Sequence, residues 1–236
     1  STGDNGSANN AGSNNNNSAS GNSNWVDVVV NNANAWNQVS ITIASVKDGS
    51  NVVVELKGNT TITASVLQTL KGRNVNLVMK LENGISWTIN GTTITNATLG
   101  NIDFGVALNT NVIPDNLISK IAGAKQTIEF SLNHNGEFGC TAQMTMNVGA
   151  ENSGKYAKLY YYNPQTGKLE FQMNGVIGAD GNTTLSFTHA SDYVIVIDTV
   201  ATVATGDTAS FAGIILLLFG GVLVLAVAFR RRRTTM

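Results

Sequence analysis

Residues 141–148, TAQMTMNV, alternate strictly between polar and apolar side chains. Three further stretches show the same period of two: residues 127–132, 168–173 and 184–187. This period places one face of each strand in a core and the other in solvent, as in antiparallel sheets. Turn-forming sequences separate the stretches, at residues 135–136, 163–167 and 180–182. The pattern predicts an antiparallel, sandwich-like β-domain over residues 100–198.

Upstream, residues 25–99 mix helical and strand patterns, which predicts a small α/β unit. Strands are expected at residues 25–30, 51–56, 74–81 and 85–89. Residues 63–71 predict a short helix, and Trp87 alternates with polar neighbours and is expected in the core. Residues 35–46 fit both periods, and the shared face of Trp36, Val39 and Ile43 favours a helix. One more helix is expected at residues 114–122, inside the β-domain, where Pro114 suits its first turn.

Residues 1–24 are almost entirely Asn, Ser and Gly. Such a composition buries too little apolar surface to offset the entropy of ordering, so we expect a disordered linker. Because Ser1 opens directly into this linker, we also expect further domains upstream of it.

The stretch 211–229, FAGIILLLFGGVLVLAVAF, has 19 residues without a charge and is followed by Arg230, Arg231, Arg232 and Arg233. As a helix it would reach about 28 Å, close to the hydrocarbon thickness of a bilayer. Short flanks rich in arginine stay on the cytoplasmic side. We therefore expect a single transmembrane helix at 211–229, a Thr/Ala-rich stalk at 199–210, a basic cytoplasmic tail at 230–236 and an extracellular N-terminus.

Two resemblances agree with this topology. Thr205, Gly206 and Asp207, followed by the apolar span and the arginines, resemble the sorting signal of Gram-positive wall-anchored proteins, although Thr202 and Val203 stand where that signal has Leu and Pro. Residues 25–198 resemble modules repeated in surface and cellulosome-associated proteins of anaerobic Firmicutes. The matching stretches are WTINGTTI (87–94), GKYAKLYYY (154–162) and LSFTHASDYV (185–194). The resemblance implies a location at the bacterial envelope and carries no catalytic residue.

Charge and cysteine content exclude several classes of protein. Without the four arginines, residues 1–210 hold ten basic and fifteen acidic residues, a net charge of −5. Nucleic-acid binding needs a clustered basic face, so we expect no nucleic-acid partner. Cys140 is the single cysteine, so an intrachain disulfide is not possible. Its alternation with Ala142 and Met144 predicts a buried thiol.

No motif predicts catalysis, a metal site or a cofactor. The sequence lacks a nucleophile elbow, a phosphate-binding loop, zinc-ligand spacing and an EF-hand. His134 is expected in a polar turn. His189, Ser191 and Asp192 are too close in sequence for a hydrolytic triad and are expected in another turn. We expect a protein that is not an enzyme.

Tyrosines supply the candidate binding residues. In the strand around 156–162, Tyr160 and Tyr162 point to one face and Tyr161 to the other. Two interpretations stay open, core packing and an exposed aromatic face that stacks on sugar rings or contacts a protein.

The favoured function is a non-enzymatic module that anchors and displays upstream domains at the envelope. The alternative is an adhesion or binding module for a polysaccharide or a surface protein. The chain would stay in the cell membrane through 211–229, or a sortase would cleave after Thr205 and link it to peptidoglycan in the cell wall.

Overall fold

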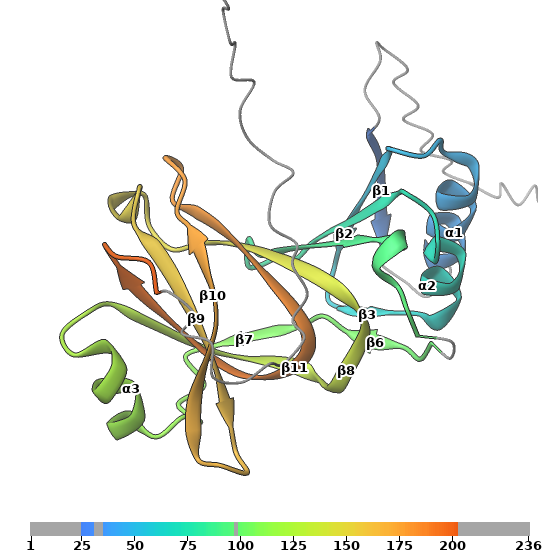
Figure 1. The fold of residues 1–236 in the computed structure, drawn as a ribbon. Helices are drawn as coiled ribbons and strands as arrows, with labels where there is room; N and C mark the ends of the chain where they lie inside the picture. Colours follow the sequence, from blue (N-terminus) through green and yellow to red (C-terminus); the bar gives the residue numbers. More distant parts are fainter. Residues whose placement is uncertain (1–24, 31–34, 97–98, 203–236) are drawn as a thin grey trace, which may run out of the picture. The chain divides into compact units, whose positions relative to one another are not determined.

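The computed structural model describes residues 25–30, 35–96 and 99–202 (Figure 1). These residues are mostly β, and nine strands form one large mixed sheet. From edge to edge its order is β1 (Trp25–Val30), β2 (Asn51–Leu56), β4 (Asn76–Lys80), β5 (Ser86–Asn90), β8 (Thr127–Asn147), β11 (Asn182–Asp198), β9 (Tyr156–Asn163) and β10 (Lys168–Val176). The ninth strand, β7 (Val106–Leu108), also pairs with β8, while β3 (Thr61–Ile62) and β6 (Ile102–Asp103) form a small separate sheet. Two short 3₁₀ helices follow β5 and β8: η1 (Gly91–Thr93) and η2 (Ala150–Asn152).

The N-terminal part has the expected helix and strand alternation. β1, β2 and β4 run parallel, and parallel neighbours need crossover connections, which α1 (Ala35–Ser45) and α2 (Ala64–Leu70) provide. The two helices contact each other, and α1 also contacts β1 and β2. The helix favoured for residues 35–46 is therefore confirmed over Ala35–Ser45, where the shared face of Trp36, Val39 and Ile43 is buried.

The sheet continues without a break from this α/β part into the β-rich part. β5 pairs antiparallel with β4 on one side and with β8 on the other. Trp87 lies opposite Met79 and Met144, and Met144 lies opposite Leu185. All four side chains are fully buried. One core thus crosses the expected boundary at residues 99 and 100, and residues up to Thr202 group into one compact unit.

Trp87 is the centre of an aromatic cluster in this core, as the alternation predicted. Its ring meets Phe104, Phe138 and Phe187 edge-on, with centroids 5.2, 6.1 and 5.5 Å away. The indole Nε1–H donates a 2.9 Å hydrogen bond to the carbonyl of Phe104. The only polar group of the side chain is therefore satisfied within the core.

Two expected turns are wrong. Asn135-Gly136 and residues 189–192 lie inside the long strands β8 and β11, which bend where their register shifts. Between the paired residues, β8 has residues 132–135 where β11 has only Ser191, and residues 138–141 where β11 has only Thr188. Gly136 and Gly139 have φ angles of 90° and 67°, which glycine adopts without strain. The turn-forming residues thus make bulges that bend a paired strand instead of reversing the chain.

The sheet has a second covered face in its β-rich part. Tyr193, Ile195 and Ile197 belong to the main core, so Val194 and Val196 point to the opposite side, and both are buried. We call this opposite side of β8, β11, β9 and β10 the outer face. Residues 109–114 and α3 (Asp115–Ala122) connect β7 to β8 here, and α3 contacts β10. The helix expected at 114–122 is confirmed, with Ala122 buried and its other apolar side chains half-buried.

Candidate functional site

The expected topology and sorting residues lie outside the described residues. These are Thr205, Gly206, Asp207 and Arg230 to Arg233, together with the apolar stretch 211–229. Among the residues that the structure describes, no helix has the length and hydropathy needed to cross a bilayer.

The tyrosines of β9 alternate as expected. Tyr161 points to the main core, where its ring lies 5.9 Å from Tyr193 and 4.9 Å from His189. Tyr160 points to the outer face and meets Phe171 of β10 edge-on at 5.6 Å. Both rings of this outer pair are partly exposed, as is Tyr162. The outer face therefore carries aromatic surface that the core does not use.

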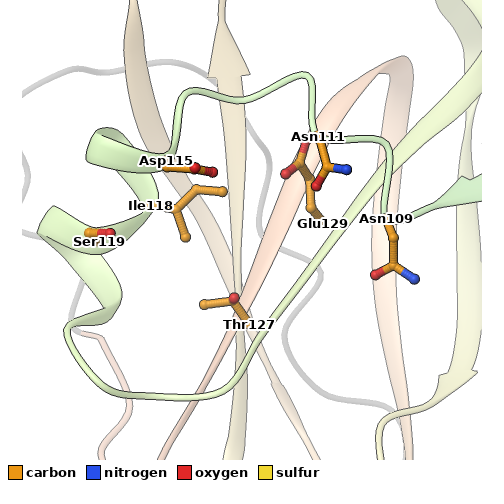
Figure 2. A pocket seen from close by; sticks show the side chains of 7 residues that line it. All are labelled: Asn109, Asn111, Asp115, Ile118, Ser119, Thr127 and Glu129. Atoms are coloured by element: carbon orange, nitrogen blue, oxygen red, sulfur yellow. The ribbon is translucent and has the colours of Figure 1, made fainter.

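A polar pocket of about 360 Å³ lies on the same outer face, beside α3 (Figure 2). Its lining comes from the loop after β7, from the first turns of α3 and from β8: Asn109, Asn111, Asp115, Ile118, Ser119, Thr127 and Glu129. Asp115 points from the start of α3 towards Asn111 and Glu129 (Figure 2). The lining holds two carboxylates and, within the described part of the chain, no lysine or arginine.

Glu129 holds the loop over the sheet. Its side chain is nearly buried, and its Oε1 accepts hydrogen bonds from the backbone N–H groups of Val112 at 2.6 Å and Ile113 at 2.9 Å. The N–H of Asn109 donates to the Glu129 carbonyl at 2.8 Å. Asn109 and Asn111 both have positive φ, 56° and 53°, a conformation that Asn tolerates better than most residues. The fold thus fixes both asparagines at the rim of the pocket.

The pocket and the aromatic pair share one register row of the sheet. Glu129 lies opposite Val194, Val194 opposite Tyr160, and Tyr160 opposite Phe171. Directly paired residues point to the same face, so this row runs along the outer face from carboxylate to aromatic pair. Two strand spacings separate Glu129 from Tyr160, which is about 10 Å.

The alternation around residues 156–162 predicted the aromatic residues, whereas no local sequence pattern predicted the pocket. Glu129 falls on the polar side of the alternation in residues 127–132, which predicted a solvent-facing carboxylate. The burial of Glu129 depends on a loop that begins 20 residues earlier, and no local pattern shows that contact. The polar run Asn109-Thr110-Asn111 ahead of Pro114 is the one sequence feature that marks the loop.

The residues around His189 do not form a triad. Within the described residues, the His189 ring contacts Tyr161, Tyr193 and the carbonyl of Ala190, and it makes no hydrogen bond to Ser191. The Tyr193 hydroxyl donates to the His189 carbonyl at 2.9 Å, and burial raises the pKa of this phenol. Asp192 accepts a hydrogen bond from Ser131. The described residues also hold no group of three or more His, Cys, Asp or Glu side chains suited to a metal ion.

Cys140 is buried, as its alternation predicted, and burial raises the pKa of its thiol to about 12. A thiol with this pKa is almost entirely protonated at neutral pH, and only the thiolate reacts rapidly. We expect native protein to react with a maleimide at least tenfold more slowly than urea-unfolded protein. Labelling of the native thiol as fast as that of free cysteine would show that Cys140 is accessible.

The two faces of β9 should respond differently to truncation. Tyr161→Ala removes an aromatic ring packed on the main core and is expected to lower the free energy of unfolding by about 3 kcal/mol. Tyr160→Ala, on the partly exposed outer face, is expected to lower it by about 1 kcal/mol. Urea unfolding of both variants measures the difference, and equal losses would mean that the outer ring is as tightly packed as the inner one.

No protein-family model, curated protein or solved structure matches this chain.

Proposed function

We propose that this chain is a non-enzymatic anchoring module that displays its folded region, and any domains upstream, at the surface of a Gram-positive cell. The observation that carries the proposal is the uncharged stretch 211–229 directly before Arg230 to Arg233. In this proposal 211–229 is a single transmembrane helix, the N-terminus is extracellular and the arginines are cytoplasmic. The folded region, with its sandwich-like β part, stands outside the membrane.

The C-terminal end of the folded region suits an anchored protein. β11 is the last strand, and it lies between β8 and β9 with hydrogen bonds to both. Asp198, at its end, pairs with Lys158 at 2.7 Å, and this hydrogen bond lowers the pKa of the carboxyl. Beyond it, the Asn174 side chain bonds both backbone groups of Thr202, at 2.8 and 3.0 Å. A pull from the anchor therefore acts on a strand that is held on both sides.

Retention in the membrane is the favoured route of anchoring. Sortase processing would cleave between Thr205 and Gly206 and transfer the Thr205 carboxyl group to peptidoglycan. In the sorting signal the proline fixes the bend before the cleaved bond, and Val203 cannot fix φ in that way.

Cysteine labelling on intact cells tests the topology. In a Cys140→Ala background, Ser18→Cys should react with a membrane-impermeant maleimide on intact cells, whereas Thr234→Cys should react only after permeabilisation. The two variants are matched controls for each other. Labelling of Thr234→Cys on intact cells, or of neither variant, would refute the proposed orientation.

A second candidate function is binding of a polysaccharide or a surface protein by the outer face. The partly exposed pair of Tyr160 and Phe171, with Tyr162 on the same side, favours it. Display and binding are compatible, because a displayed module can also hold a partner.

A further inference from the structure

We infer that the outer face binds a neutral polysaccharide, with hydroxyl groups in the pocket beside α3 and a sugar ring against Tyr160 and Phe171. This inference rests on the second candidate function and names its ligand class. It does not depend on the anchor.

The lining of the pocket suits a ligand rich in hydroxyl groups. Six of its seven side chains carry oxygen or amide groups: Asn109, Asn111, Asp115, Ser119, Thr127 and Glu129. Carboxylates accept hydrogen bonds from hydroxyl groups, and the two amides both donate and accept. The hydrogen bonds from Val112 and Ile113 both go to Oε1 of Glu129. The other carboxylate oxygen, Oε2, has no hydrogen-bond partner among the described residues.

The charge of the pocket selects against anionic polymers. Asp115 and Glu129 both line it, and no basic side chain of the described lining offsets them. A phosphate or uronate group would be repelled there, whereas the hydroxyl groups of a neutral sugar meet acceptors at no electrostatic cost. The pocket therefore fits neutral rather than acidic polysaccharides.

The geometry of the register row suits an oligomer. Glu129 in the pocket and Tyr160 lie about 10 Å apart along the row, with buried Val194 between them, a separation that successive units of a chain can span. The rings of Tyr160 and Phe171 supply apolar surface at the second position, where the C–H groups of a sugar ring can pack. Two contacts on one folded face favour binding, because Glu129 already holds the loop that lines the pocket through its hydrogen bonds to Val112 and Ile113.

The test uses the full chain in a detergent without a sugar headgroup. Isothermal titration calorimetry would measure binding of xylohexaose, hydroxyethylcellulose and chitohexaose, with polygalacturonate as the anionic comparison. We expect at least one neutral glycan to bind and polygalacturonate not to bind.

Two pairs of variants locate the site. Asp115→Asn and Tyr160→Ala should each weaken binding about tenfold, since each loses one strong contact. Asn116→Ala changes the exposed neighbour of Asp115 outside the lining, and Tyr156→Ala removes another tyrosine of the same strand; both should bind like the parent. Thermal unfolding of every variant checks that it is folded.

Several outcomes would overturn the inference. The inference is wrong if none of the three neutral glycans binds, if all variants bind glycan with equal affinity, or if polygalacturonate binds more tightly than the neutral glycans. Stabilisation by Ca²⁺ without glycan binding would assign the pocket to a cation instead. None of the four variants changes residues 203–236, so labelling of Thr234→Cys distinguishes a failure of glycan binding from a failure of the anchor.

Discussion

Trp87→Ala is expected to lower the free energy of unfolding by about 3–5 kcal/mol, the range for removing a large buried aromatic side chain. The side chain is fully buried, and it contacts three phenylalanines from three segments. Its removal opens a cavity at the point where β5 joins the α/β part to β8. Because natural domains are stable by only about 5–15 kcal/mol, this loss is a large share of the total.

Trp87→Phe separates packing from hydrogen bonding. It keeps an aromatic ring but leaves the Phe104 carbonyl without its partner, and should cost less than the alanine variant. Urea unfolding followed by circular dichroism measures both. A loss below about 1 kcal/mol for Trp87→Ala would show that the two parts of the sheet do not share a core.

Placing two arginines in the apolar stretch, Leu217→Arg with Leu223→Arg, is expected to release the protein from the membrane fraction. Each arginine near the middle of a transmembrane helix costs about 2.5–3.5 kcal/mol for insertion, and each lost leucine adds a few tenths. The total of about 6–8 kcal/mol corresponds to a change of several orders of magnitude in the inserted fraction.

Leu217→Ala with Leu223→Ala is the matched control, because it shortens the same side chains without adding charge. It should remain with the membranes after washing in high salt, which removes proteins held only by surface charge. If the arginine variant also remains, residues 211–229 are not what holds the protein there.

Local patterns predicted those parts of the fold that depend on neighbours in sequence. The alternation in residues 141–148 marks β8, and it correctly places Cys140 and Met144 in the core. The helix at 35–45 follows from one apolar face. Trp87 could be assigned to the core because Ile85 and Ile89 share its parity.

Long-range pairing decided the parts that local patterns missed. Asn135-Gly136 is a strong turn signal, yet β11 pairs across it and converts the turn into a bulge. Glu129 has the same polarity as an exposed strand residue, and only the N–H groups of Val112 and Ile113 explain why it is buried. The alternation of the tyrosines in β9 was predictable from the sequence. The burial of Val194 and Val196 on the outer face was not.

The fate of residues 211–236 tests the proposed anchoring most directly. Cells producing the full chain would be separated into membrane, wall and medium fractions, and the C-terminal peptides mapped by mass spectrometry. If the chain is retained in the membrane, an intact peptide from Phe211 to Met236 is expected in the membrane fraction. A chain that ends at Thr205 on wall fragments would contradict membrane retention, and an intact chain free in the medium would contradict anchoring altogether.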